Sequence, residues 1–214
     1  MIPLLFLFGV MVTVLPRGSA EEAGEYWMKY LVTVKVNETV GLFARPQFRF
    51  RNDFNDYYFM SAWAGSRLRI FSWLEIAPQY CYKTTESASG RWTHANYLAC
   101  DLTPKIIVGD LKITDRSRVM YGLDDYIWIY RNRIKIAYSF KNCLGGHGLV
   151  IFTAAEGFWN DQGDGLFENR WETGVGAKLV KEVGLDISYI YRNKKKSGNR
   201  VKSHIICSLL KFQF

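Results

Sequence analysis

The sequence predicts an all-β protein, an up-and-down antiparallel barrel that spans a membrane, and three observations support this prediction. The chain ends in an alternating run, Val201 to Phe214, whose apolar face finishes on Phe side chains. Aromatic residues make up 16% of the chain, although its mean hydropathy is close to neutral. Extended runs with period-two alternation follow one another and are joined alternately by short and by longer polar segments. Strands with lipid on one face and a polar lumen on the other produce this combination.

The first twenty residues are expected to lie outside the fold. Ile2 to Leu15 is an apolar run, and Gly18-Ser19-Ala20 supplies the small residues that suit signal-peptidase cleavage. The run is too short to span a membrane as a helix, and it breaks at Pro16-Arg17. We therefore predict a signal peptide over residues 1–20 and a single barrel domain over residues 21–214, exported to the outer membrane of a diderm bacterium.

Eleven extended runs follow the predicted signal peptide. They are Tyr26–Val36, Val40–Arg51, Tyr57–Ile70, Trp73–Lys83, Trp92–Pro104, Leu111–Tyr121, Tyr126–Ser139, Leu149–Phe158, Phe167–Val180, Leu185–Arg192 and Val201–Phe214. Bacterial single-chain barrels have an even number of strands. If one run is not a strand, the expected barrel has ten strands. If one strand lacks a recognisable alternating run, it has twelve.

Each run is assigned as a strand because its alternate residues form two different faces. The first sets Tyr, Met and Val against Lys and Thr, and the second sets Leu and Phe against Arg and Gln. Pro46 interrupts the second run and predicts a β-bulge, because proline removes one donor from the ladder. Leu111–Tyr121 places Lys112, Arg116 and Arg118 on one side. In Tyr126–Ser139, aromatic and Ile side chains share one face, and Arg and Lys share the other.

A soluble sandwich or lipocalin-type barrel also produces eight to ten alternating strands. The strands that end in aromatic residues, the terminal Phe and the alternation of loop lengths favour the membrane barrel. Leu210, Phe212 and Phe214 also match the C-terminal signal that bacterial outer-membrane barrels present to their assembly machinery, which is thus an expected partner.

The polar faces of the runs predict a charged lumen. Its expected members are Arg45, Arg49, Arg116, Arg118, Arg131, Arg133, Glu156, Arg170 and Glu172, and Arg51, Arg67, Arg69, Glu75 and Glu168 share these faces. Arginine and carboxylate side chains pair through two parallel hydrogen bonds, so they suit a narrow lumen. We expect Glu156 and Glu172 to be ionised among the arginines. The network is either a closed plug or a slender path that favours anions.

The net charge of +8 has no nucleic-acid motif beside it, so we expect membrane phosphates rather than nucleic acid as partners. The one charge run extends from Arg192 to Arg200, with Lys202 beyond it, and Lys194, Lys195 and Lys196 are at its centre. This run is a solvated loop or, if it faces outward, a site for lipopolysaccharide phosphates.

No catalytic, metal or cofactor motif is found in the sequence. The three His residues, His94, His147 and His204, lack a nucleophile elbow, and His204 and Ser208 are roughly 13 Å apart along a strand. The four Cys residues, at positions 81, 100, 143 and 207, show no paired metal spacing, and their disulfide state is open. The sequence thus favours a non-enzymatic structural or partner-binding barrel without cofactors. A narrow pore for small anionic solutes is the alternative, and a lipid-modifying enzyme is a third hypothesis.

Several short motifs occur in order along the chain. They are Trp27 and Arg51 on the first two runs, Asp115-Arg116-Ser117-Arg118, Tyr130-Arg131-Asn132-Arg133, Ala155-Glu156-Gly157-Phe158, Asn169-Arg170-Trp171-Glu172-Thr173-Gly174 and Tyr189-Ile190-Tyr191. In this order the chain resembles a family of bacterial outer-membrane barrels of unknown function that carries a domain-of-unknown-function label. The resemblance implies architecture and location, and it implies no activity.

Overall fold

The computed structural model describes residues 24–52, 54–87, 89–144, 147–162, 165–196 and 199–214. Their strands are β1 (Glu25–Lys35), β2 (Val40–Arg51), β3 (Asp56–Phe71), β4 (Leu74–Glu86), β5 (Trp92–Val108), β6 (Leu111–Gly122), β7 (Trp128–Leu144), β8 (His147–Asn160), β9 (Gly165–Lys178), β10 (Val183–Lys196) and β11 (Asn199–Gln213). The predicted signal peptide, Met1 to Ala20, lies outside the described residues and stays a prediction. No helix in the described ranges has the length and apolarity that crossing a membrane requires.

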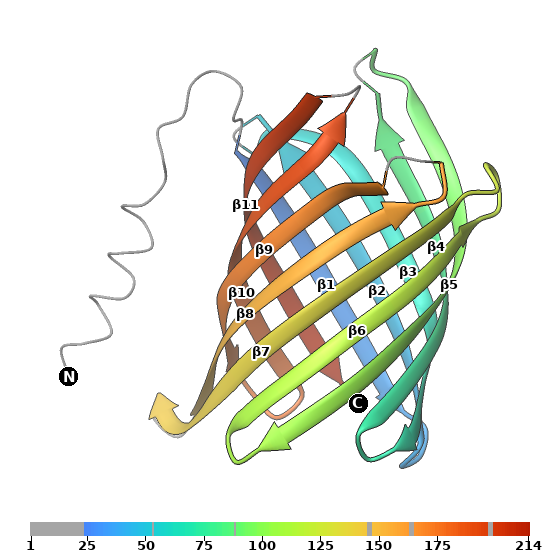
Figure 1. Cartoon of the computed structure of the whole chain (residues 1–214). Coiled ribbons are helices and arrows are strands. Elements are labelled where there is room, and N and C mark those ends of the chain that lie inside the picture. The colour runs from blue at the N-terminus through green and yellow to red at the C-terminus, as the bar shows by residue number, and fades with distance from the viewer. Residues whose placement is uncertain (1–23, 53, 88, 145–146, 163–164, 197–198) are drawn as a thin grey trace.

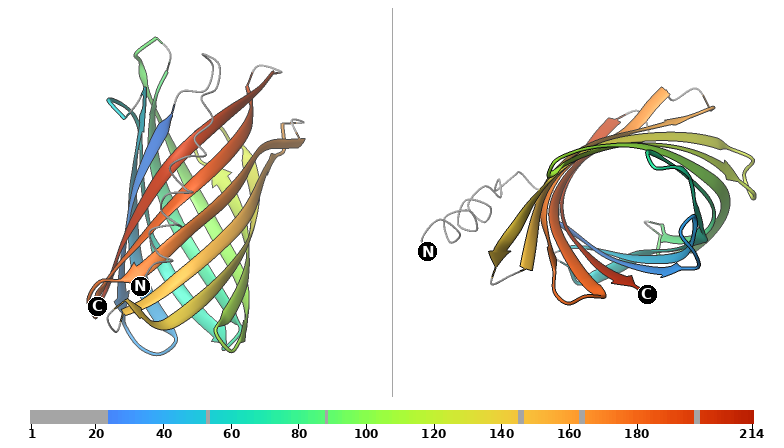
Figure 2. Two further views of the ribbon diagram at one scale, coloured as in Figure 1. Left: turned by 90° about the vertical axis from the view of Figure 1, so that its left-hand side faces the viewer. Right: turned by 90° about the horizontal axis from the view of Figure 1, so that it is seen from below.

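The strands form one closed up-and-down barrel, which confirms the predicted fold class (Figures 1 and 2). Each strand pairs antiparallel with its neighbour in sequence, and β1 closes the ring by pairing with β11. The β1–β2 and β3–β4 turns lie at the lower rim in Figure 1, and the β2–β3 and β4–β5 connections lie at the upper rim.

The expected strand number of ten or twelve is wrong for the described residues, which contain eleven strands. The eleven runs of the sequence are the eleven strands, and none is discarded or added. An odd number closes because β1 and β11 run parallel, from Glu25 opposite Ile205 to Thr33 opposite Gln213. As a result, β1 begins at the upper rim and β11 ends at the lower rim (Figure 1).

The β-bulge expected at Pro46 is also absent, and the register shift in β2 lies between Arg49 and Phe50 instead. Pro46 pairs in register with Ala62 on the β3 side. On the β1 side the ladder skips from Lys29–Gln47 to Val32–Ala44 without any change of register. The missing proline donor therefore leaves a gap in one ladder rather than an extra residue.

The outer face carries aromatic side chains near both rims. Near the upper rim Tyr57 lies against Trp92, with ring centroids 5.4 Å apart, and Tyr121 lies against Trp128 at 4.8 Å. Near the lower rim Phe71 stacks on Trp73, with centroids 5.6 Å apart. Exposed Leu, Ile and Val side chains occupy the face between them. Two aromatic belts around an apolar band are the outer surface expected of a barrel in a bilayer.

The interior is polar as well as apolar. Its fully buried side chains include Trp27, Arg118, Ile190 and Ile205, so a charged guanidinium lies as deep as the aliphatic residues. Burying such a charge is costly unless carboxylates, amides or aromatic rings within the barrel contact it.

Candidate functional site

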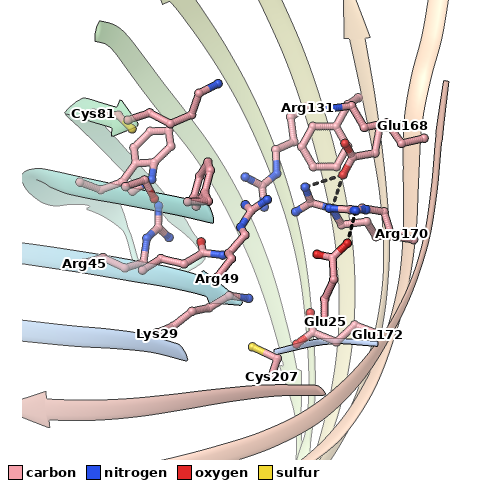
Figure 3. Close-up of a pocket in the computed structure, with 18 of the residues that line it drawn as sticks. Glu25, Lys29, Arg45, Arg49, Cys81, Arg131, Glu168, Arg170, Glu172 and Cys207 are labelled. Atoms are coloured by element: carbon pink, nitrogen blue, oxygen red, sulfur yellow. Dashed lines mark hydrogen bonds and ion pairs between the residues drawn. The ribbon is translucent and has the colours of Figure 1, made fainter. Parts of the chain in front are cut away.

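A cavity of about 1130 Å³ occupies the lumen, and all eleven strands contribute to its wall (Figure 3). Thirteen of the side chains that line it are Lys or Arg, and five are Asp or Glu. Alternation along the strands produces this wall, because each strand turns its polar set inward and its apolar set outward. The cavity wall therefore carries a clear excess of positive charge.

Glu156 of β8 is the most heavily shared carboxylate of the barrel interior. It is 8% exposed and lies 3.0 Å from Arg116, 2.5 Å from Arg131 and 3.6 Å from the guanidinium of Arg170. Arg133 lies directly opposite Glu156 in the β-ladder, but its Nη2 donates to Glu172, 2.6 Å away. Glu172 also accepts a hydrogen bond from Ser188 at 2.8 Å. The structure thus brings both predicted carboxylates among the predicted arginines.

Phe152 and Phe158 share the inward face of β8 with Glu156 and are 4% and 8% exposed. The Arg131 guanidinium lies 4.8 Å from the Phe158 ring centroid, and Lys135 lies 3.6 Å from that of Phe152. Aromatic faces of this kind attract cations. The Phe158 ring thus adds to the ion pair that Arg131 makes with Glu156, and the Phe152 ring stabilises the charge of Lys135.

Trp27, on the inward face of β1, is the centre of a second group. Its side chain is fully buried, and four cations lie around its ring: Arg49 at 3.9 Å, Arg170 at 4.8 Å, Lys29 at 5.2 Å and Arg192 at 5.6 Å. The indole Nε1 donates to Glu25 at 2.9 Å. Glu25 also accepts from Tyr58 at 2.6 Å and from Arg192 at 2.5 Å, so this group ties β1 to β3 and β10.

Arg118 of β6 holds a third group. Its Nε and Nη2 donate to the two carboxylate oxygens of Asp101, at 2.5 and 2.7 Å, and Nη2 lies 3.5 Å from the Gln79 side-chain oxygen. A Cβ atom on Gly65 would lie 2.7 Å from the Cβ of Gln79, so glycine leaves the room that Gln79 occupies. Sequence reasoning missed Asp101, Glu25 and Gln79. The alternation of side chains along the strands could have found them. Asp101, for example, is four residues from Tyr97 and lies with it on the inward face of β5.

Two predicted lumen arginines have neither a hydrogen-bond acceptor nor a carboxylate partner among the described residues. Arg45 lies 5.2 Å from the ring centroid of Trp63. Arg49 lies between the rings of Trp27 and Phe59, 3.9 Å from each centroid. Figure 3 shows both side chains reaching into the cavity from the same strand. Aromatic faces stabilise the positive charge of these two side chains, and no ion pair within the described ranges neutralises it.

The remaining side chains of the predicted polar faces lie toward the two rims. Arg51 pairs with Asp56 and Glu86 at the upper rim. Arg67 lies 3.9 Å from Glu75 and lines both the main cavity and a recess of about 160 Å³ at the lower rim, which Arg69 also lines. Glu168 pairs with Arg170 at 2.5 Å.

The C-terminal residues of β11 complete the seam with β1. Leu210 lies opposite Tyr30 and Phe212 opposite Val32. The backbone N–H of Phe214 donates to Thr33, and its carbonyl accepts from Lys35. The role of these residues as an assembly signal stays a prediction.

The basic run at residues 194–196 is not wholly a solvated loop. Lys194 lies opposite Glu168 in the β9–β10 ladder and lines the cavity. Lys195 belongs to the end of β10, and the side chain of Lys196 lies outside what the structure describes. The lipopolysaccharide site expected at these three lysines stays a prediction.

The described residues form no metal cluster, and His204 and Ser208 hydrogen-bond to different partners. No group of three His, Cys, Asp or Glu side chains in these ranges can hold a metal ion. His204 Nδ1 hydrogen-bonds to Tyr189, whereas the Ser208 hydroxyl hydrogen-bonds to Tyr26. The four cysteines at positions 81, 100, 143 and 207 are free thiols.

A family model described as "Protein of unknown function (DUF2490)" matches residues 24–203. The chain belongs to this family. The match extends from β1 into β11, so it spans the strands that carry all three groups of lumen side chains. The family resemblance drawn from the short motifs is confirmed.

A solved structure, LpxR from Salmonella typhimurium, has the same fold. It superposes with a TM-score of 0.56 over 86% of this chain and 87% of LpxR, at 9% sequence identity. At this identity the likeness shows the fold alone, which is that of an outer-membrane barrel. A search of curated proteins finds no significant match.

The expectation that this barrel is not an enzyme is corrected by this likeness. LpxR is an outer-membrane lipid A deacylase, so a barrel of this architecture supports catalysis. The absence of a nucleophile elbow excludes one kind of active site only. In a barrel, catalytic side chains can come from different strands, and then no short sequence motif identifies them.

Proposed function

We propose that the protein lies in the outer membrane and that its lumen takes up and passes small anionic solutes. The observation that supports this most is the wall of the cavity, where thirteen basic side chains face five acidic ones. A cleft lined by one sign of charge within low-dielectric walls focuses the electric field and concentrates counter-ions. The apolar band and the two aromatic belts of the outer face support the location.

The excess charge extends toward the lower rim. Arg67 lies between the main cavity and the lower recess, which Lys35 and Arg69 also line. In this recess the three cations outnumber the two acids, Glu38 and Glu75. A wall that attracts anions along much of its length, with aromatic faces in place of acids, suits passage better than a fully neutralised plug does.

Solute entry into proteoliposomes tests this proposal. The full chain is refolded into vesicles, and the entry of glycerol 3-phosphate is compared with that of glycerol and of choline. We expect the anion to enter faster than the cation, and empty vesicles to take up neither. Equal entry of both charged solutes, or none of either, would contradict the proposal. The structural or partner-binding barrel predicted from the sequence requires no entry of any solute.

A second candidate is an enzyme that acts on an anionic lipid, favoured by the fold shared with LpxR over 86% of this chain. In that case the basic wall would hold the anionic headgroup. The test is release of fatty acid from lipopolysaccharide or phospholipid in mixed micelles with the purified protein. Release above that of a heat-denatured sample supports the enzyme, and no release together with anion entry supports the pore.

A further inference from the structure

Several buried nitrogen donors on β2, β4 and β6 have no acceptor among the described residues. They are Gln47 Nε2, Arg49 Nε, Gln79 Nε2, Arg116 Nε and Arg118 Nη1. A buried donor without an acceptor is costly, and native proteins contain few of them. Gln47, Arg49 and Arg116 line the cavity, whereas Gln79 and Arg118 are buried beside it. A ligand with several acceptor atoms would satisfy donors of this kind.

The donors at the centre of this group are firmly held. Arg118 is fully buried, and its bidentate contact with Asp101 fixes the plane of the guanidinium, which leaves Nη1 free. Gln79 is 5% exposed; its oxygen faces Arg118 Nη2, and its amide nitrogen is unpaired. Donors fixed in this way lose little conformational freedom when an acceptor reaches them.

Arg45 brings a further charge to the same place. The guanidinium of Arg45 lies 5.2 Å from the ring centroid of Trp63, and that of Arg118 lies 4.4 Å from it, so the two arginines share one indole. Arg116 lies 3.9 Å from Asp101 without forming a hydrogen bond through Nε. Asp101 is thus the acid between two arginines, while Arg45 has none.

We propose that Arg45 and Arg116, which line the cavity, form a binding site for a phosphate-type oxyanion together with the buried Gln79 and Arg118 beside them. The inference deepens the proposed function, because it names the class of anion on which that function acts. Guanidinium groups present planar forks that match phosphate oxygens. An oxyanion with three or more acceptor oxygens satisfies donors from separate strands at once, which one chloride ion cannot do.

Binding is measured on the folded full chain in detergent micelles, so the result does not depend on transport. Inorganic phosphate is titrated, at matched ionic strength against chloride, while the thermal unfolding midpoint is followed. We expect a saturable rise of the midpoint with phosphate and none with chloride. Equal effects of phosphate and chloride would overturn the proposal. Failure of solute entry into vesicles would count against passage and would leave this result standing.

Two variants locate the site. Arg45→Gln removes a charge that has no ion pair, and it should weaken the apparent phosphate affinity about tenfold or more. Gln79→Glu places a carboxylate beside Arg118 Nη2. The phosphate response should be lost, with an unfolding midpoint without phosphate no lower than that of the wild type. Arg91→Gln, the same charge change in the exposed β4–β5 loop, is the control and should respond as the wild type. A wild-type response in Gln79→Glu and in any folded Arg45→Gln would overturn the site.

The source of the oxyanion is resolved by two further probes. Competition by glycerol 3-phosphate in micelles identifies a soluble phosphate ester. A rise of the midpoint in nanodiscs that contain phosphatidic acid, compared with phosphatidylcholine alone and without competition by the soluble ester, identifies a lipid headgroup. Either result supports the oxyanion site, and no effect of any phosphate probe contradicts it.

Discussion

Trp27 shows how a single residue organises the lumen. Its ring has four cations around it, and its Nε1–H anchors Glu25, which in turn accepts hydrogen bonds from Tyr58 and Arg192. The indole therefore does two separable things. Its face stabilises positive charge without neutralising it, and its edge orients the carboxylate that does neutralise charge.

Substitution separates these two roles. Trp27→Phe removes the hydrogen bond to Glu25 and keeps an aromatic face, so it should lower the free energy of unfolding by about 1 kcal/mol. Trp27→Leu removes the aromatic face as well, and the loss should reach roughly 3 kcal/mol. Denaturant titration in detergent micelles measures both. Trp171→Leu, at an exposed Trp of the outer face, is the control. If the Phe and Leu variants lose the same free energy of unfolding, the ring face does not stabilise the surrounding cations.

Glu156 is the residue whose loss should cost most among the acids. Glu156→Gln leaves Arg116, Arg131 and Arg170 without their shared carboxylate in a partly desolvated wall. Uncompensated buried charge costs about 3 kcal/mol, so the unfolding midpoint in detergent should fall. Glu38→Gln, in the exposed β1–β2 turn, should leave the midpoint unchanged. If the two variants melt alike, the lumen is more hydrated than its contacts imply.

At the scale of the strand, each in-strand proline lies where one ladder is interrupted. The β3–β4 ladder skips the pairs around Pro78, and the β5–β6 ladder skips those around Pro104, as the β1–β2 ladder does at Pro46. In all three cases the register is the same on both sides of the gap. Proline therefore costs one strand pair its donor and leaves the inward and outward faces of the strand unchanged.

The alternation of side chains explains how much of the fold was predictable. The strand from Val40 to Arg51 is predicted to its ends, because Leu and Phe alternate with Arg and Gln throughout it. The strand predicted to end at Pro104 continues to Val108, because Pro104 costs only one ladder contact. Parity placed Glu156 and Arg131 on one wall. The partnerships of Asp101 and Glu25 were not predictable, since they depend on the strand order around the ring.

No local sequence pattern predicts the parallel pairing of β1 with β11. Cross-linking tests this pairing. Cysteines at Met28 and Ser208, which are directly opposite, should be joined by oxidation or by a short bifunctional maleimide in a Cys100→Ser, Cys143→Ser background. Cysteines at Met28 and Phe212, four residues further along β11 and roughly 13 Å away, should not. Cross-linking of the second pair in preference to the first would contradict the register.

At the scale of the whole molecule, the two faces of the barrel account for its composition. The outer face uses the aromatic and aliphatic residues, and the lumen uses the charges, so the mean hydropathy is near zero. Heat-modifiable gel mobility tests this arrangement. The protein should partition with the outer-membrane fraction and migrate differently before and after boiling, because a closed barrel resists detergent until it is heated. Recovery in a soluble fraction with unchanged mobility is the contrary result.

The central claim is that the lumen is an anion-selective space, and the reversal potential across a planar bilayer tests it most directly. The full chain is inserted between two unequal concentrations of potassium chloride, and the voltage of zero current is read from its channel events. The excess of lumenal Lys and Arg predicts a reversal potential displaced toward the equilibrium potential of chloride. A displacement toward the potassium potential, or a bilayer that stays silent although folded barrels are incorporated, would contradict it.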